Sequence, residues 1–301
     1  MLYYLCLICS IITTITLSYF NNYFTWKFCY VPFLLFIAFS LLYFALTFII
    51  LFLIALPIKK KKDFYPKHSN FYRYVMDEGL IFLMKMARIK IHFENKDLIP
   101  QDQRFLVISN HKSKFDPMVV NAYLKGFKIS WITKRSLFKM PLVSNYMYKT
   151  CFMPLDRDNL RQEIELMKKI KVSLKEDNLK WIIFPEGTRS KNINHEVNEF
   201  KAGSFKMAMS QGVDIYPVAT WGSFRVLDPH VNNLKKYPIY IHVFEPLKKE
   251  FYQNMTTQEL ANYVQNLVSN KLVELRKIDE ENLNKDRKST RLNSSHDQIS
   301  Y

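Results

Sequence analysis

The sequence predicts an α/β fold with a mixed, mostly parallel sheet flanked by helices, behind two N-terminal helices that span or are embedded in a membrane. From residue 89 onward, short β-rich runs alternate with helical stretches, as in sheets whose strands are connected by helices. Residues 1–58 contain one charged side chain, Lys27, which indicates a membrane anchor ahead of this domain. The strands are expected at Ile89–Glu94, Phe105–Ser109, Ile129–Thr133, Cys151–Leu155, Trp181–Phe184, Ile215–Thr220 and Ile239–Phe244.

Two uncharged stretches make up most of the predicted anchor, residues 1–62. Residues 1–20 and 28–58 are each long enough to cross a bilayer, for which about 20 apolar residues suffice. Thr and Ser side chains weaken the prediction for the first stretch. A cleaved signal peptide is the alternative there, although its basic start and small-residue cleavage site are missing. Four lysines at positions 59–62 follow the second stretch, and by the positive-inside rule they predict that the rest of the chain is cytoplasmic.

Helices are also expected between the strands. Residues 63–88 should form a helix that lies on the membrane surface or packs against the domain, and an ordinary core helix is the alternative. Apolar residues recur at helical spacing from Leu160 to Leu174. Ala202–Gln211 has the same pattern, and Gly212 is placed to end that helix.

The C-terminal part is expected to change character near residue 279. A helix over residues 256–278, capped by Thr257, completes the predicted domain of residues 89–278. Residues 279–301 are polar and lack periodicity, so we expect a disordered tail. The end of that tail resembles translated adapter sequence more than natural protein, and it is excluded from the predicted fold.

The positive charge is concentrated in the body of the protein. The 301-residue chain has a net charge of +16, of which residues 1–58 contribute one unit. Such a body favours anionic lipid headgroups or phosphorylated substrates as partners, and nucleic acid is the alternative. The four cysteines have no spacing typical of a metal site or a disulfide framework, so no metal ion is expected.

His111 and Asp116 stand in a turn that directly follows the expected strand Phe105–Ser109. In α/β folds, ligands collect at the C-terminal ends of strands. A His with a nearby carboxylate has the groups needed to take a proton from a hydroxyl at neutral pH. The alternative is that Asp116 merely caps a helix that begins at Pro117. Ser113 is expected to hydrogen-bond the turn rather than to act as a nucleophile.

A second turn, containing Glu186, Gly187, Thr188 and Arg189, follows the strand Trp181–Phe184. Arg189 offers a planar set of donors suited to a phosphate, and Thr188 adds a hydroxyl. The chain has only six glycines, so Gly187 is expected to serve backbone geometry or a close approach. The alternative is that Glu186 and Arg189 pair with each other. No lysine-bearing glycine-rich loop is present, so a nucleoside triphosphate site is not indicated.

A third turn places Lys134 and Arg135 after the strand Ile129–Thr133. Two adjacent cations suit an anionic headgroup. A solvated basic loop is the alternative, and the local sequence favours it.

The three turns together resemble a known family. The blocks NHKSKFD, KRSLFKMP and FPEGTRS, followed by the strand end at Tyr216–Ala219, resemble in order and spacing the glycerolipid acyltransferases, and more closely the membrane-bound 1-acylglycerol-3-phosphate acyltransferases. The resemblance covers about residues 85–250. Lys112 and Lys114 make the first block more basic than in many members, which leaves the headgroup preference open.

The resemblance implies a glycerolipid acyltransferase fold and direct acyl transfer. His111 would be the general base that deprotonates the acceptor hydroxyl, and Asp116 would orient it. Lys134 and Arg189 would bind the phosphate of the acceptor. The chain lacks a G-x-S-x-G elbow, which agrees with a reaction that has no acyl-enzyme intermediate. The remaining residues that the resemblance assigns to the site are Glu186, Gly187 and Thr188 and, as weaker assignments, Asn110, Arg135, Lys201 and Gly203.

On this basis we expect a membrane-anchored acyltransferase of phospholipid biosynthesis. It would move a fatty acyl group from acyl-CoA or acyl carrier protein to the sn-2 hydroxyl of lysophosphatidic acid, giving phosphatidic acid, without a cofactor. The expected partners are this lysolipid, the acyl donor and the bilayer, and not nucleic acid. The alternatives are another acceptor, such as glycerol 3-phosphate or a lysophospholipid, and a non-catalytic, membrane-tethered protein that binds anionic lipid.

Overall fold

All the strands expected from the sequence are present in the computed structural model, within one or two residues of their predicted ends. The chain forms two compact units, one of Met1–Arg88 with Asn121–Lys169 and the other of Ile89–Val120 with Ile170–Tyr301. The lysines at positions 59–62 lie outside the described residues. The structure describes residues 2–58, 67–155, 160–176, 178–190, 192, 196–226 and 238–296.

The second unit contains a mixed, mostly parallel sheet, which confirms the predicted fold class. Its strands lie in the order β1-β7-β6-β2-β5. Neighbouring strands are parallel except for β6 and β7, which are antiparallel. The strands are β1 (Lys90–Glu94), β2 (Phe105–Ser109), β5 (Lys180–Ile183), β6 (Asp214–Trp221) and β7 (Pro238–Val243).

Strand β2 lies at the centre of this sheet, between β5 and β6, and is parallel to both. Phe105, Leu106, Val107 and Ile108 are fully buried, because a strand covered on both faces favours a continuous apolar run. The C-terminal ends of β2, β5 and β6 therefore meet at one edge of the sheet. The chain turns that follow them are brought together there.

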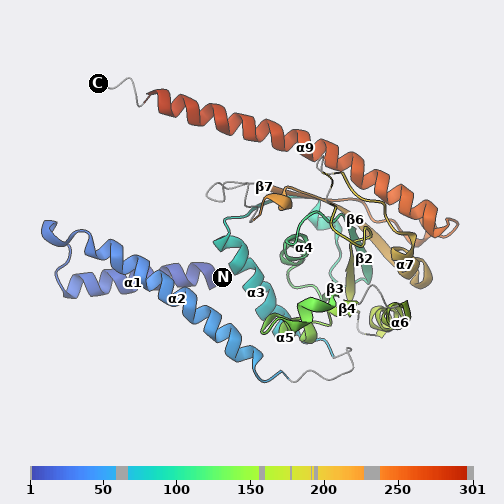
Figure 1. Cartoon of the computed structure of the whole chain (residues 1–301), viewed down its shortest axis with the longest axis horizontal. Helices are drawn as coiled ribbons and strands as arrows, with labels where there is room; N and C mark the ends of the chain where they lie inside the picture. Colours follow the sequence, from blue (N-terminus) through green and yellow to red (C-terminus); the bar gives the residue numbers. More distant parts are fainter. Residues whose placement is uncertain are drawn as a thin grey trace. The chain divides into compact units, whose positions relative to one another are not determined.

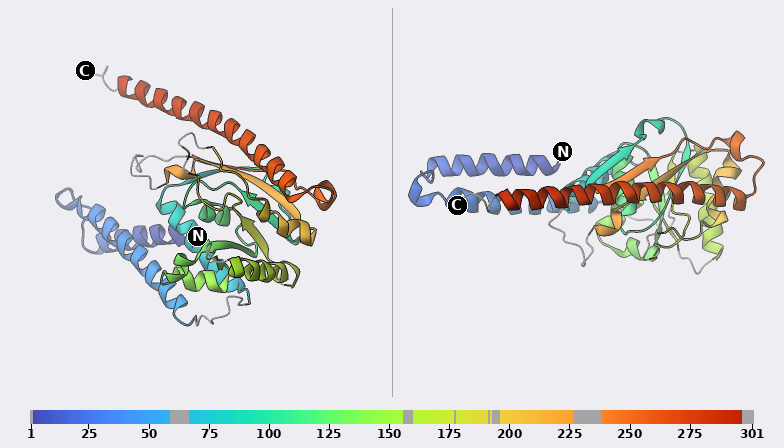
Figure 2. Two further views of the ribbon diagram at one scale, coloured as in Figure 1. Left: turned by 45° about the vertical axis from the view of Figure 1, so that its right-hand side comes forward. Right: turned by 90° about the horizontal axis from the view of Figure 1, so that it is seen from above.

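Helix α9 (Thr257–His296) packs on β6 and β7, and Figure 2 shows it as one continuous helix. Its buried apolar residues recur at helical spacing, as expected for an amphipathic helix. These residues are Leu260, Ala261, Val264, Val268, Leu272 and Leu275.

Two details of α9 differ from expectation. The cap is Thr256 rather than Thr257: the Glu259 amide donates to Thr256 Oγ1 at 3.2 Å, and the Thr256 amide donates to Glu259 Oε2 at 2.7 Å. This is a capping box, which satisfies two amides at once. The helix also continues beyond residue 278, and Asp279 is 1% exposed. The sequence pattern did not indicate that Asp279 is buried, because its burial depends on a polar partner that lies far away in the sequence.

The remaining helices of the second unit lie between its strands or, for α8, between β7 and α9. Gly212 ends α7 with φ at 59°, as predicted, because this left-handed conformation favours glycine. The helices are η2 (Lys96–Leu98), η4 (Ala202–Ser204), α7 (Lys206–Gln211), η5 (Ser223–Arg225) and α8 (Lys249–Tyr252), while α4 (Asp116–Tyr123) and α6 (Leu160–Glu176) each run from one unit into the other.

In the first unit, α1 (Leu2–Phe20) and α2 (Val31–Ala55) form a helical hairpin (Figure 1). By length and composition, both helices could cross a membrane. Most of their large apolar side chains are exposed, as expected for surfaces that face lipid. The predicted pair of apolar N-terminal helices is therefore confirmed.

Helix α3 (Asn70–Met86) packs against this hairpin through the buried ring of Phe82. Its edge-to-face contacts with Tyr3, Phe44 and Phe48 have centroid separations of 5.5 to 6.3 Å. The unit also contains the parallel strands β3 (Ile129–Lys134) and β4 (Met153–Leu155), with η1 (Trp26–Phe28), η3 (Arg135–Lys139) and α5 (Val143–Lys149).

Candidate active site

The candidate site is built from the turns that follow β2, β5 and β6. The first turn carries His111 and Asp116, and the second carries Glu186. The third carries Ser223, which sequence reasoning missed. Residues far apart in the chain meet here because the three parallel strands end at the same edge.

His111 and Asp116 are in direct contact. His111 Nδ1 lies 2.9 Å from Asp116 Oδ2. The same oxygen accepts the amides of Lys112 at 2.6 Å and Ser113 at 2.7 Å. Within the described part of the chain, the backbone amides bound by Asp116 therefore come before helix α4 and not from its first turn. The carboxylate thus organises the turn that precedes the helix and does not cap the helix. The Ser113 hydroxyl accepts the Phe115 amide at 3.1 Å, the turn contact expected of it.

Asp116 is fully buried, and its second oxygen accepts a hydrogen bond from the Ser223 hydroxyl. The carboxylate thus accepts two backbone N–H donors and one hydroxyl. In the His111 tautomer that matches this arrangement, Nδ1 donates to Asp116 Oδ2 and Nε2 is left as the basic nitrogen. The His111 side chain is 16% exposed, which leaves it accessible as a base.

The sequence offered one weak signal for Ser223, which is its position two residues after the end of β6. Gly222 holds that turn with φ at 91°, and a Cβ there would lie 2.5 Å from the Pro238 carbonyl oxygen. The turn therefore requires glycine in both conformation and space.

Glu186 supports the backbone of the His111 turn. Its Oε1 accepts the His111 amide at 2.6 Å, and its Oε2 accepts the Asn198 amide at 2.9 Å. Burial raises the pKa of Glu186, and these two amide hydrogen bonds act in the opposite direction. The contacts described for Glu186 thus join two chain segments through their backbone amides. Arg189, which the alternative prediction paired with Glu186, is exposed.

A ring and a backbone hydrogen bond fix His111 further. The Phe184 ring lies 4.5 Å from the imidazole centroid to centroid, tilted by 30°. The Ser190 amide donates to the His111 carbonyl at 2.9 Å. Phe184 was expected as the last residue of a strand and the first of the FPEGTRS block, and its contact with the imidazole was not predicted.

Gly187 and Lys201 are brought together. Gly187 has φ at 68°, and a Cβ there would lie 3.0 Å from Lys201 Nζ, so the glycine allows the close approach expected of it. Lys201 also donates its amide to the Pro185 carbonyl at 3.0 Å. Gly203 has open space around its Cα, with no atom within 4 Å of an added Cβ. Thr188, like Arg189, is exposed in this turn.

Asn110 has a positioning contact instead of a free side chain. Its Nδ2 donates to the Thr220 carbonyl at 3.0 Å, and its Oδ1 accepts the Thr220 amide at 2.8 Å. The side chain thus continues the pairing of β2 with β6 beyond the last residue of β2.

Lys134 and Arg135 belong to the other compact unit. They lie where β3 ends and η3 begins, and both are exposed. Their participation in the site stays a prediction.

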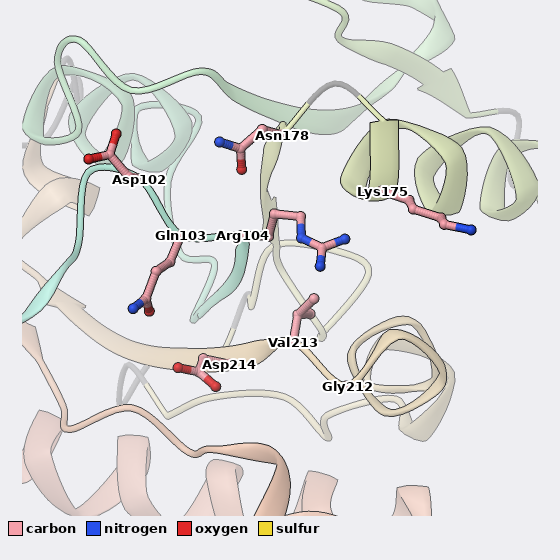
Figure 3. A pocket seen from close by; sticks show the side chains of 8 residues that line it. All are labelled: Asp102, Gln103, Arg104, Lys175, Asn178, Gly212, Val213 and Asp214. Atoms are coloured by element: carbon pink, nitrogen blue, oxygen red, sulfur yellow. The ribbon is translucent and has the colours of Figure 1, made fainter.

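A separate polar cavity of about 490 Å³ is present in the second unit (Figure 3). It includes Arg104, which precedes β2, and Asp214, which begins β6, so it lies at the edge where these parallel strands start. His111 follows the other end of β2, and the cavity is therefore not part of the candidate site. Its lining consists of Asp102, Gln103, Arg104, Lys175, Asn178, Gly212, Val213 and Asp214.

Within the described ranges, no group of three His, Cys, Asp or Glu side chains could hold a metal ion.

Known proteins share both the sequence pattern and the fold. A family model described as Acyltransferase matches residues 90–221. A 1-acyl-sn-glycerol-3-phosphate acyltransferase of Haemophilus influenzae is 30% identical over 181 residues, which cover 59% of this chain and 73% of that protein. A probable 1-acyl-sn-glycerol-3-phosphate acyltransferase of Mycoplasma pneumoniae is 26% identical, covering 66% and 77%.

The solved structure of the 1-acyl-sn-glycerophosphate acyltransferase PlsC from Thermotoga maritima is similar to the fold described above. The TM-score is 0.55 at 26% identity, and the match covers 68% of this chain and 81% of that chain. By its sequence and its fold, this chain is therefore an acyltransferase enzyme and belongs to the glycerolipid acyltransferase family.

Proposed function

We propose that this enzyme transfers a fatty acyl group from acyl-CoA or acyl carrier protein to the sn-2 hydroxyl of 1-acylglycerol 3-phosphate, giving phosphatidic acid for phospholipid biosynthesis. The observation that carries the proposal is the His111–Asp116 pair, which leaves Nε2 as the basic atom. The names of the relatives support the choice of acceptor.

In the proposed reaction, His111 Nε2 takes the proton of the acceptor hydroxyl as its oxygen attacks the thioester carbonyl. The C–O bond forms, the C–S bond breaks, and the proton on His111 passes to the departing thiolate. Asp116 stabilises the imidazolium that forms between these two proton transfers. A thioester supplies an adequate leaving group, so the proposal includes no cofactor and no metal ion.

Arg189, Lys134 and Thr188 are proposed to bind the phosphate of the acceptor. The exposure of all three side chains leaves their donors available to a ligand, and Arg189 adds a planar set of donors that matches phosphate oxygens. Lys201 approaches Gly187 closely and would place a further cation in this turn. The bilayer holds both lipid substrate and product, and the lysines at positions 59–62 favour a cytoplasmic catalytic body.

The first test is His111→Ala in the full-length chain in membranes, measured by thiol release from a fatty acyl thioester with lysophosphatidic acid. We expect a loss of at least about 100-fold, because a positioned base contributes about 10²- to 10⁴-fold. His242→Gln is the matched control, since His242 also pairs with a carboxylate, that of Glu94 at 2.7 Å, and is 14% exposed, but lies within β7. Full activity of His111→Ala would contradict the mechanism.

Another acceptor within the same reaction class is the second candidate, because Lys112 and Lys114 make the first block unusually basic. A panel of lysophosphatidic acid, glycerol 3-phosphate and neutral lysophospholipids with one labelled thioester separates these acceptors.

A further inference from the structure

Asp279 is a buried carboxylate on α9, outside the region that resembles the family. It is 1% exposed, and a charge in such a place is tolerated when it is fully paired. Its Oδ2 accepts the Trp221 indole N–H at 2.9 Å and a hydrogen bond from Arg225 Nη2. Its Oδ1 accepts from Arg225 Nη1 at 3.2 Å. The Arg225 contact is the two-pronged geometry that orients both partners firmly.

The two partners of Asp279 flank the turn that carries Ser223. Trp221 is the last residue of β6, and Arg225 is the last residue of η5. The guanidinium of Arg225 also lies 5.1 Å from the centre of the Phe224 ring, a cation–π contact. Asp279 therefore holds the turn at both ends and leaves Ser223 between them.

Ser223 connects this turn to the catalytic pair. Its hydroxyl donates to Asp116 Oδ1, while Asp116 Oδ2 contacts His111 Nδ1. If Ser223 moved, one oxygen of the fully buried Asp116 would lose a hydrogen-bond donor described for it. The loss of a partner at a buried polar atom is unfavourable, so the carboxylate would reorient and carry the imidazole with it.

We infer that Asp279 is a positioning residue for the acyl transfer, which acts through Trp221, Arg225 and Ser223 to hold Asp116 in line with His111. This inference rests on the proposed role of His111 as the base. It gives a positioning role to a part of the chain that lies outside the family match over residues 90–221. The hydrophobic periodicity of the sequence did not indicate this role either.

The test is Asp279→Asn in the full-length chain, assayed in membranes with lysophosphatidic acid and a fatty acyl thioester. We expect kcat to fall by about 10- to 100-fold, because small misplacements of catalytic groups have effects of this size, with little change in the KM of either substrate. Glu280→Gln is the matched control on the next residue, because Glu280 is exposed and pairs with Arg276 at 2.8 Å. It should keep wild-type kcat.

A double-mutant cycle with Ser223→Ala separates positioning from a general loss of structure. If Asp279 acts through Ser223, the double variant should be no slower than Ser223→Ala alone, because both changes remove the same contact. If the two losses in kcat multiply in the double variant, the inference is overturned. Should Asp279→Asn not accumulate, Trp221→Phe removes the indole donor together with part of the ring that packs on Phe224. Its expected several-fold fall in kcat should likewise vanish in the Ser223→Ala background.

The outcomes also distinguish this inference from the proposed function. Activity retained in His111→Ala would remove the general base, and the positioning role with it. A fully inactive His111→Ala beside an Asp279→Asn variant with wild-type kcat would leave the proposed function intact and overturn the role of Asp279 alone.

Discussion

At the residue scale, Glu186 couples the stability of the site to pH. The carboxylate is 3% exposed, and burial raises its pKa above the ordinary value of 4.5, against the two amide hydrogen bonds. Because the folded state then binds the proton more tightly than the unfolded state, this group should reduce stability as pH rises from 4.5 through the raised pKa. In Glu186→Gln that component is absent, so the melting temperature of the variant relative to wild type should rise across this window. Thermal unfolding of the detergent-solubilised protein at several pH values measures it, with Glu280→Gln as an exposed control. A difference that does not change with pH would contradict this assignment.

At the element scale, the turn after β6 should tolerate substitution of its glycine far less than η4 does. Gly222 has φ at 91°, and an added Cβ would lie 2.5 Å from a backbone oxygen, whereas Gly203 has no atom within 4 Å. We expect Gly222→Ala to lower the free energy of unfolding by about 1–3 kcal/mol, the range for residues in strained backbone conformations. It should also lower activity, because it displaces Ser223. Gly203→Ala should retain stability, because an added Cβ meets no atom there. Denaturant unfolding together with the thiol-release assay tests both, and equal behaviour of the two variants would show that the turn does not depend on Gly222.

The same elements show what the sequence could and could not predict. The strands were predictable because each is a short apolar run bounded by polar turns, and the parallel order brought His111 and Glu186 to one edge by a general rule. Ser223 was not predictable, because its contact joins residues 107 positions apart and its local sequence contains no catalytic pattern. Asp279 was assigned to a disordered tail for a similar reason: low periodicity describes its neighbours, whereas its burial depends on Arg225, which is 54 positions away.

At the scale of the whole molecule, the uneven charge predicts how the chain crosses the membrane. Residues 1–58 carry one charge, and four lysines follow at positions 59–62, which favours a cytoplasmic body by the positive-inside rule. Helices α1 and α2 have 19 and 25 residues. At about 1.5 Å per residue, α1 is about 28 Å long and α2 about 37 Å long, so α1 nearly matches and α2 exceeds a hydrocarbon core of about 30 Å. If both helices span the membrane, the connection between them lies on the opposite side from the body.

Cys29 is exposed in the connection between α1 and α2, whereas Cys6 and Cys151 are buried and Cys9 lies within α1. A membrane-impermeant maleimide should therefore label the wild-type chain in right-side-out vesicles, and Cys29→Ser should abolish that labelling. Labelling of Cys29 in inside-out vesicles alone would place the connection on the cytoplasmic face. Protection from both sides, relieved only by detergent, would mean that the hairpin enters the bilayer without crossing it.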